Sequence, residues 1–393
     1  KEKFEVLSVK NGERRKKPPL PFTTSTLQQE ASKRLNMSTQ KTMRLAQELY
    51  EGVTLKGKGS VGLITYLRTD STRISEEADA SCREYIAQQY GEQFVGDKTA
   101  VKSSKTGKIQ DAHEAIRPTD SSLSPAMLKE QLPRDLFRLY QLIWTRFLAS
   151  RMAEAVYETT SVKIGAGDYR FNVAASKVKF DGFMTVYSYD SEKSTMNAAM
   201  KKITKDTEIT LSGLDPQQHF TQPPAHFTEA SLVKTLEELG IGRPSTYAPT
   251  ITTLLARRYI VKESKNLYIT ELGEAVNDMM EDGFPTIVDV NFTAKMESLL
   301  DGVEEGKVKW KTIVENFYPD MMQAVEKAEK ELEEVKIEDE VSEEVCEECG
   351  RNMVVKYGPH GKFLACPGFP DCRNTKPYYE KIGVSCPKCG KDV

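Results

Sequence analysis

Six of the seven cysteines lie in the C-terminal part of the chain, in closely spaced pairs. Cys346 and Cys349 enclose two residues, and Cys366 and Cys372 follow as a second pair. Such pairs in a chain without a secretion signal are typical of metal ligands, and four thiolates satisfy tetrahedral Zn²⁺. We therefore predict a structural zinc site and a reducing, cytoplasmic setting, with free thiols and disulfides as the alternatives.

A third pair of cysteines, Cys386 and Cys389, lies in residues 381–393. Two thiolates supply half of a tetrahedral site, so this segment is predicted to begin a second, truncated zinc ribbon. Cys82 stands alone, and we expect it to be a buried apolar residue.

The spacing of apolar residues changes twice along the chain. It is helical over 26–151, with capping-box spacing from Thr26 to Gln29. Alternating apolar residues and Gly-Asp turns then predict several strands up to about residue 220, and a further strand is expected before residue 25. From residue 228 the order is helix, turn, helix and hairpin, with Gly240 ending the first helix, and that order is typical of a winged helix.

These periods predict an α+β multidomain protein with mainly helical, winged-helix-like domains. The predicted β-rich domain combines 1–25 and 152–222, and the helical domains cover 26–151 and 223–335. A linker and a four-cysteine zinc ribbon occupy 336–380. The acidic run 326–344 is interpreted as a solvated helix end and linker, which leaves the rest of the chain more basic than its net charge of −3 indicates. No apolar run is long enough to span a membrane.

Three motifs that would indicate other enzyme classes are incomplete. Residues 52–58 fit the start of a phosphate-binding loop, but Gly59 replaces the Ser or Thr that binds magnesium. His113-Glu114 begins like a zinc-protease motif, but Arg117 stands where the second histidine is needed. No Gly-x-Ser-x-Gly elbow is present. ATP-driven and hydrolytic enzymes are therefore not predicted.

Tyr66 lies in the stretch Gly-Leu-Ile-Thr-Tyr-Leu-Arg-Thr-Asp-Ser-Thr-Arg at residues 62–73. In an extended chain Tyr66, Arg68 and Asp70 project to one side. A cation beside a phenol favours the nucleophilic phenolate and can bind a phosphate under attack. The alternative is a core tyrosine beside a surface arginine, and the spacing alone favours that alternative.

Residues 62–73 resemble the active-site signature of the bacterial type IA DNA topoisomerases. Other segments that resemble motifs of this family follow in the family's order, and the resemblance covers essentially the whole chain. They are Pro-Pro-Leu-Pro-Phe-Thr-Thr-Ser-Thr-Leu-Gln-Gln-Glu at 18–30, Ala-His-Glu-Ala-Ile-Arg-Pro-Thr at 112–119, Pro-Ala-His-Phe-Thr-Glu-Ala-Ser-Leu-Val at 224–233 and Gly-Ile-Gly-Arg-Pro-Ser-Thr-Tyr-Ala at 240–248.

The resemblance implies a toroidal core in which the β-rich part is an arch. It also implies ATP-independent relaxation of negatively supercoiled DNA, by transient cleavage of one strand, strand passage and religation. By position, Tyr66 resembles the nucleophile and Arg68 its phosphate-stabilising partner. His113 resembles a phosphate-contacting histidine, with a hydrogen-bonded structural histidine as the alternative.

Arg243, Ser245 and Thr246 resemble a site that grips the DNA backbone. Ser245 is predicted to cap the following helix, where free amides and the helix dipole attract a phosphate. Arg243 would add a charge-assisted hydrogen bond. The alternative is a simple cap beside a solvent-exposed arginine.

The cysteine-rich region resembles the C-terminal zinc ribbons of the same family, down to Phe-Leu-Ala-Cys-Pro-Gly-Phe-Pro-Asp-Cys at 363–372. Aromatic residues interleave there with lysines and arginines, a combination that suits single-stranded DNA. These aromatic residues are Phe363, Phe369, Tyr378 and Tyr379. For Phe363 and Phe369, a place in the ribbon's own small core is an equal alternative.

The family also carries a Toprim domain with an acidic Mg²⁺ site, and we expect this chain to begin after it because no matching Asp-x-Asp cluster is present. This chain alone is therefore expected to be inactive or impaired. The expected partner is DNA, chiefly single-stranded regions, bound by a monomer. The competing hypothesis is a non-catalytic module that binds single-stranded DNA through winged helices and zinc ribbons.

Overall fold

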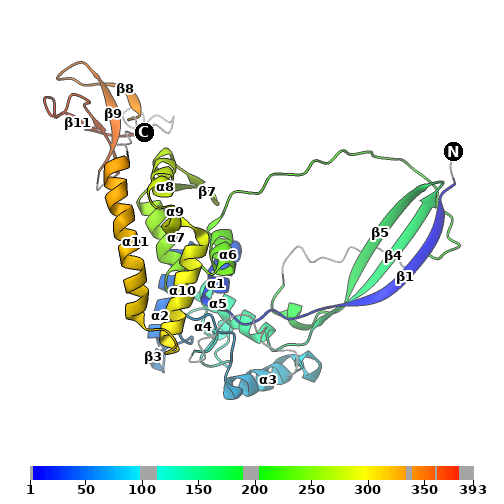
Figure 1. Ribbon diagram of the computed structural model, residues 1–393. Helices are drawn as coiled ribbons and strands as arrows, with labels where there is room; N and C mark the ends of the chain where they lie inside the picture. Colours follow the sequence, from blue (N-terminus) through cyan, green and yellow to red (C-terminus); the bar gives the residue numbers. More distant parts are fainter. Residues whose placement is uncertain (1–2, 98–112, 189–202, 333–338, 359–360, 380–393) are drawn as a thin grey trace, which may run out of the picture.

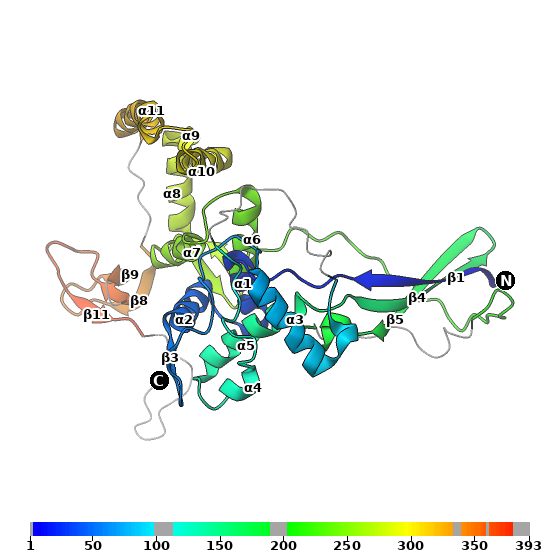
Figure 2. The ribbon, with the colours of Figure 1, turned by 90° about the horizontal axis from the view of Figure 1, so that it is seen from below.

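The computed structural model describes residues 3–97, 113–188, 203–332, 339–358 and 361–379. A helical body carries a long three-stranded sheet on one side, and a small C-terminal sheet lies beyond the last helix (Figure 1). Figure 2 shows the two sheets on opposite sides of the body. No helix in these described ranges has the length and apolar character needed to cross a membrane.

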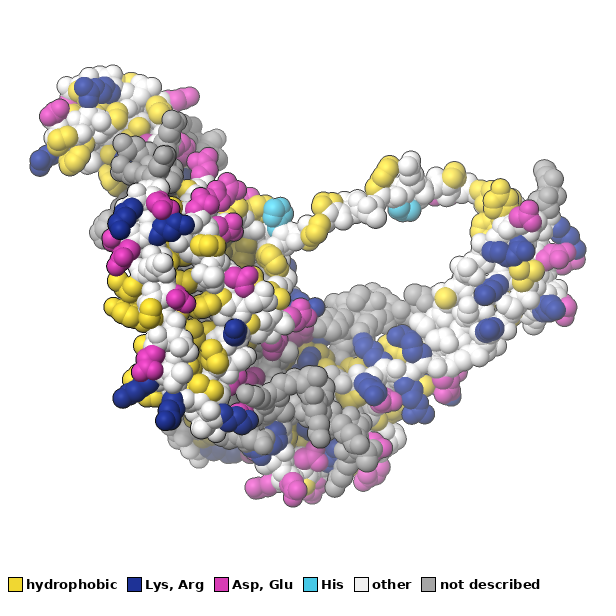
Figure 3. Space-filling view, in the orientation of Figure 1, with side chains coloured by type: hydrophobic (Ala, Val, Ile, Leu, Met, Phe, Trp, Pro, Cys, Tyr) yellow, Lys and Arg dark blue, Asp and Glu magenta, His cyan; other side chains and the backbone are white. Residues whose placement is uncertain are grey.

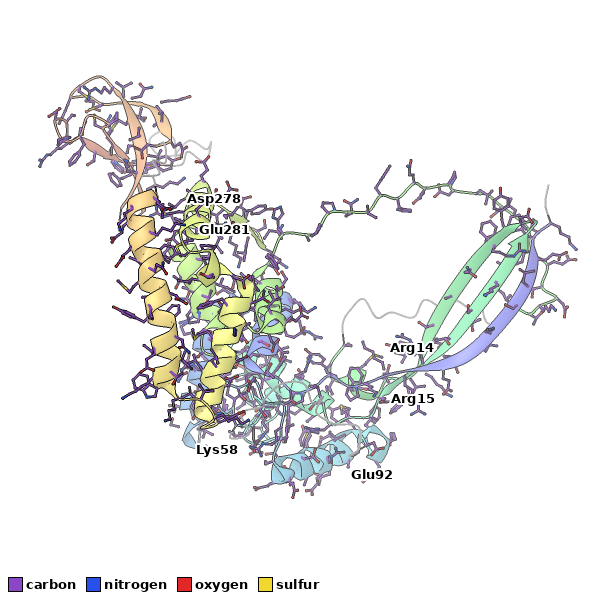
Figure 4. All side chains as sticks on the ribbon, in the orientation of Figure 1. Arg14, Arg15, Lys58, Glu92, Asp278 and Glu281 are labelled. Atoms are coloured by element: carbon purple, nitrogen blue, oxygen red, sulfur yellow. The ribbon has the colours of Figure 1, made fainter. Side chains whose placement is uncertain are left out.

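The long sheet is antiparallel, in the order β1-β4-β5. Its strands are β1 (Glu5–Lys16), β4 (Ala155–Ala166) and β5 (Tyr169–Phe180). Few of its side chains are buried, so the backbone ladder and contacts between neighbouring strands stabilise it. Arg14 stacks on the ring of Tyr157, 4.5 Å from its centroid, near the end of β1 that meets the body (Figure 4).

The predicted strands beyond residue 180 are absent from the described residues. Phe183 and Thr185 belong to a 3-10 helix, η4 (Gly182–Thr185). Ile209 and Leu211 lie in the mostly extended, exposed segment 203–227, which belongs to no sheet. Alternation predicts an extended chain there, but no neighbouring strand supplies the hydrogen bonds of a sheet.

The first helical part of the body follows β1 directly. The predicted helix start at Thr26 is wrong by one turn, because Thr23 is the N-cap and Thr26 completes a reciprocal capping box. The apolar face of α5 (Arg134–Ala149) is buried in the main core. The elements are α1 (Thr24–Glu30), the π-helix η1 (Ala31–Leu35), α2 (Thr39–Glu51), β2 (Val53–Leu55), β3 (Gly59–Val61), α3 (Glu76–Tyr90), the 3-10 helix η2 (Glu92–Phe94), α4 (Pro125–Leu128) and α5 (Arg134–Ala149).

The segment that resembled a phosphate-binding loop is a two-stranded hairpin formed by β2 and β3. Lys58 lies in its turn (Figure 4), where Gly57 and Gly59 have positive φ. No helix follows it directly, so the strand–loop–helix geometry of a phosphate loop is absent here.

The second helical part has the predicted order of helix, turn, helix and hairpin. Gly240, at φ 71°, ends α6 in the left-handed conformation. Its elements are α6 (Glu229–Leu239), α7 (Tyr247–Ala256), β6 (Ile260–Glu263), β7 (Asn266–Ile269), α8 (Glu271–Gly283), α9 (Pro285–Val288), α10 (Val290–Glu304) and α11 (Trp310–Glu331).

The two helical parts contact each other through α1 with α6 and α2 with α7. The chain leaves the first part along β4 and returns to it along β5, and residues 203–227 later run from the far end of the long sheet to the second part (Figure 1). This course produces the opening between that segment, the long sheet and the body in Figure 3. The predicted toroidal arrangement is therefore present.

The C-terminal sheet has the order β11-β10-β9-β8 and a small core of its own. Its strands are β8 (Val341–Val345), β9 (Asn352–Gly358), β10 (Gly361–Ala365) and β11 (Thr375–Pro377). The predicted second ribbon at 381–393, with Cys386 and Cys389, lies outside the described residues.

Candidate active site and zinc centre

The tyrosine segment, residues 62–73, is fixed on one side by the N-terminus of α1. The amide of Thr24 donates to the carbonyl of Thr69 at 2.8 Å, and the amide of Thr69 donates to the hydroxyl oxygen of Thr24 at 2.9 Å. The Thr24 hydroxyl lies 2.7 Å from the carbonyl oxygen of Leu67. Because Thr24 is fully buried, this pairing ties the segment to the helix that follows β1.

Residues 113–119 fix the other side of the tyrosine segment. The amide of Thr65 donates to the carbonyl of Arg117 at 2.9 Å, and the amide of Arg117 donates back to the Thr65 hydroxyl at 3.0 Å. The amide of Ala115 donates to the carbonyl of Arg73 at 2.8 Å. Three motifs that are distant in sequence therefore meet at one place.

This support produces the predicted alternation of side chains without a strand. Leu67 and Thr69 are buried, while Arg68 and Asp70 are exposed and Tyr66 is half-buried. The backbone here is held by single hydrogen bonds and one isolated bridge, between Ile64 and Pro118, instead of a ladder. The expectation of a common side for Tyr66, Arg68 and Asp70 agrees with their exposure.

The ring of Tyr66 lies between two aromatic neighbours. Its centroid is 4.9 Å from that of His113, with the planes tilted by 30°, and 5.6 Å from that of Tyr50, in an edge contact. The Nδ1 atom of His113 is buried and has no hydrogen-bond partner among the described residues. His113 is thus beside the tyrosine, and the structure gives its Nδ1 no structural hydrogen bond within those ranges.

Arg68 forms no ion pair or hydrogen bond within the described part of the chain. Its side chain lines a pocket that Ser245 also lines, so the tyrosine segment and the start of α7 face a common space. An exposed guanidinium without a carboxylate partner is suited to bind a phosphate.

The prediction that Ser245 caps the next helix is wrong. Helix α7 begins at Tyr247 with Thr246 as its N-cap, and no side chain caps it. The Thr246 hydroxyl instead accepts a hydrogen bond from the amide of Arg243 at 2.8 Å. The Thr246 hydroxyl is thus held in the turn that follows Gly242, whose φ is 79°.

Arg243 is also not the solvent-exposed arginine of the alternative. Its guanidinium donates to Asp301 of α10 at 2.8 Å, and Glu297 lies 3.8 Å away. Its side chain is only 30% exposed. The three residues are therefore close together, but the arginine is paired with acidic residues of α10.

The four cysteines of the ribbon come together as predicted. The sulfur atoms of Cys346, Cys349, Cys366 and Cys372 all lie within 4.8 Å of one another. The separations are 3.7 Å for Cys346–Cys372 and 3.2 Å for Cys349–Cys366. These are far longer than a disulfide bond of ~2.05 Å and near the ~3.8 Å edge of a tetrahedron with Zn–S bonds of ~2.3 Å, so the set fits Zn²⁺.

The aromatic residues of the ribbon divide into two groups. Tyr378 packs against the ribbon core, so its assignment to a stacking surface is not supported. Phe369 and Tyr379 are 71% and 79% exposed. Phe363 is half-buried and is not part of that core. The exposed pair provides faces on which bases can stack.

Two contributors to the site were missed by the sequence reasoning. Glu229, within the motif at 224–233, is 3% exposed and accepts hydrogen bonds from the amide and hydroxyl of Thr39, at 2.7 and 2.9 Å. Gln40 lines the same pocket as Arg68. A buried carboxylate at a helix start has no distinctive sequence signal, and the spacing within α2 does not show that Gln40 faces Arg68.

Comparison with known proteins identifies the class of protein that this fold and site define. Residues 1–315 match the family model described as DNA topoisomerase, and residues 343–381 match the one described as topoisomerase DNA binding C4 zinc finger. The chain therefore belongs to the DNA topoisomerase family.

Among solved structures, the chain is similar to full-length topoisomerase I from Thermotoga maritima. The TM-score is 0.69 and the sequence identity 35%, over 100% of this chain and 62% of that one. These matches place the chain among the bacterial type IA enzymes, topoisomerase I. It spans less than two thirds of the length of that relative.

Proposed function

We propose that the protein containing this chain relaxes negatively supercoiled DNA without ATP, with Tyr66 as the nucleophile. One observation carries the proposal. Segments from three distant parts of the sequence hold Tyr66 half-exposed beside His113, with Arg68 presented from the same segment without an acidic partner in the described residues.

The chemistry of this step balances without a nucleotide. The phenolic oxygen of Tyr66 forms a bond to a backbone phosphorus, and one phosphorus–oxygen bond of the strand breaks. The leaving sugar oxygen takes up a proton, and the tyrosine loses one. Because one phosphate ester replaces another, the reverse attack reseals the strand after the other strand has passed.

Arg68 would bind the phosphate as charge develops on it, and His113 would contact the same phosphate. Arg243, Ser245 and Thr246 would grip the DNA backbone further along. For Arg243 this requires a phosphate to displace Asp301, which now accepts its hydrogen bond at 2.8 Å.

The ribbon would add a second contact to single-stranded DNA through Phe369 and Tyr379, held in place by structural zinc. The resemblance implies Mg²⁺, but the described residues contain no acidic cluster that matches its site. The group of potential metal ligands found within the described residues is the set of four cysteines, so no step is assigned to Mg²⁺. We also propose that the protein is cytoplasmic and monomeric.

Plasmid relaxation by the complete protein tests this assignment. Tyr66→Phe removes the attacking oxygen and keeps the ring packing with His113 and Tyr50, so relaxation and the covalent protein–DNA adduct are expected to vanish. Tyr50→Phe is the matched control and is expected to retain the adduct. An adduct that persists in Tyr66→Phe would refute Tyr66 as the nucleophile, whereas absence of any adduct with the unaltered complete protein would favour the non-catalytic alternative.

A further inference from the structure

A pocket of about 360 Å³ lies between α2 and α7, beside the tyrosine segment. Its walls come from three separate parts of the sequence. They are Gln40 and Met43 of α2, Arg68, and Pro244, Ser245, Ala248, Pro249, Thr252 and Thr253 at and before α7.

The lining combines flat apolar surface with a few polar groups. Met43, Pro244 and Pro249 supply apolar walls, while hydroxyl and amide groups supply donors and acceptors. Arg68 is the one charged side chain among the lining residues, and no carboxylate lines the pocket. The volume is at the lower end of the range of about 300–1,000 Å³ for small-ligand sites. These properties suit an anion that carries a single planar ring system.

A nucleotide of single-stranded DNA has this chemistry. Its base would lie between the apolar walls, and the Arg68 guanidinium would pair with the phosphate that joins it to the neighbouring nucleotide, the phosphate that Tyr66 attacks. We propose that this pocket receives one nucleotide next to the phosphate that Tyr66 attacks. Gln40 and Thr253 then contact the edge of its base, so the pocket contributes to the choice of cleavage site. The inference rests on the proposed function, because Arg68 connects the pocket to Tyr66.

The polar side chains of the pocket are available for such contacts. Gln40, Ser245 and Thr253 are exposed, and none of their side chains has a hydrogen bond within the described ranges. Thr252 donates its hydroxyl hydrogen to the carbonyl of Ala248 at 2.9 Å, which leaves the lone pairs of its oxygen to accept. A paired base in a duplex has its edge occupied, so the pocket selects single strands.

The two walls belong to the two helical parts of the body. Gln40 follows Thr39, whose amide and hydroxyl bond to Glu229. This buried link joins α2 to α6, the helix that precedes α7 in the second part, and a nucleotide in the pocket contacts both parts. The pocket is complete only while they are together.

The test fills the pocket from α7. Thr253→Phe places a ring in it, and Thr250→Phe is the control, since Thr250 is an exposed threonine of the same helix outside the lining. Fluorescence anisotropy measures binding of the 393-residue chain to labelled single-stranded oligonucleotides of dA, dC or dT. We expect Thr253→Phe to weaken binding about tenfold and to reduce differences between the bases. Thr250→Phe is expected to remain within about twofold of wild type, since it keeps the stacking surface.

Equal binding by the two variants would overturn the proposal, as would failure of the unaltered chain to bind single strands. Circular dichroism checks that both variants fold. If Thr253→Phe does not fold, binding by Gln40→Ala, on the opposite wall of the pocket, provides the test. In the complete protein, pocket variants are expected to redistribute cleavage among sites. That result separates the pocket from the nucleophile, because loss of the adduct in Tyr66→Phe depends on the nucleophile alone.

Discussion

The carboxylate of Glu229, at the start of α6, accepts two hydrogen bonds from Thr39 at the start of α2. Lys262 of β6 completes the arrangement, with its Nζ atom 2.6 Å from the carboxylate. This is a buried polar link between the two helical parts, at the contact that closes the ring.

Glu229→Gln is expected to destabilise the chain by about 1–3 kcal/mol, because the hydrogen bonds to a buried charged group are weakened. Urea unfolding measures the change in the free energy of unfolding. Glu238→Gln, which changes a 62% exposed carboxylate of the same helix, is the control. Its cost is expected to be under about 1 kcal/mol, and an equal cost for both variants would refute the role of the link.

The same link makes stability depend on pH. Burial raises the pKa of Glu229, but hydrogen bonds from Lys262 and Thr39 outweigh burial and lower it overall. A folded-state pKa below the unfolded value of ~4.3 means that the stabilisation is present above that pH. It is lost as pH falls through the folded value. The stability difference between wild type and Glu229→Gln should therefore shrink on acidification from neutral pH, and a constant difference would contradict this.

Thr24 positions the tyrosine segment through three hydrogen bonds, to the backbone of Leu67 and Thr69. Thr24→Val keeps the shape of the side chain and removes the hydroxyl partner of the Leu67 carbonyl and the Thr69 amide, at a cost of about 1–3 kcal/mol. In the complete protein we expect a lower rate of DNA cleavage as well. Thr23→Val, which removes the α1 cap, is the control, since Thr23 bonds only within its own turn in the described contacts. Equal cleavage rates in the two variants would count against a positioning role.

The zinc site and the winged-helix order could be predicted because each depends on local spacing. Two cysteine pairs and the helical period of α6 and α7 need little information from distant residues. The pairing of Thr24 with Thr69 could not be predicted, because nothing in either segment specifies its partner. The strands predicted at Ile209 and Leu211 failed for the same reason, since alternation does not show whether a neighbouring strand is present.

The helix start at residue 245 was misplaced for a more local reason. Ser245 is a favourable N-cap residue by type, but the Thr246 hydroxyl bonds to the Arg243 backbone and delays the helix to Tyr247. The partner of Arg243 could not be predicted either, because Asp301 lies 58 residues away in the sequence.

Removal of zinc is expected to unfold the ribbon and leave the helical body folded. The ribbon has its own small core, separate from the main core, and the binding energy of structural zinc is largely folding energy in small domains. Chelation should therefore release one Zn²⁺ for the Cys346–Cys372 set and expose residues 341–377 to proteolysis. Cys346→Ser should have the same effect, whereas Cys82→Ala, at a buried cysteine of the main core, should retain the metal. Full zinc content in Cys346→Ser would refute the ligand assignment.

Two variants of the ion pair between Arg243 and Asp301 are expected to change DNA binding at the proposed backbone grip in opposite directions. Arg243→Ala removes a phosphate contact, so binding to single-stranded DNA should weaken and its logarithmic salt slope should fall by about 0.7. Asp301→Asn keeps the size of the side chain and removes its charge, which leaves Glu297, 3.8 Å away, as the acidic partner of Arg243. Arg243 is then more available to a phosphate, and binding should tighten. Asp282→Asn, an exposed carboxylate of α8, controls for the change in net charge alone. The affinity at several salt concentrations distinguishes these cases. Equal gains in affinity from Asp301→Asn and Asp282→Asn would mean that general charge, and not release of Arg243, determines DNA binding.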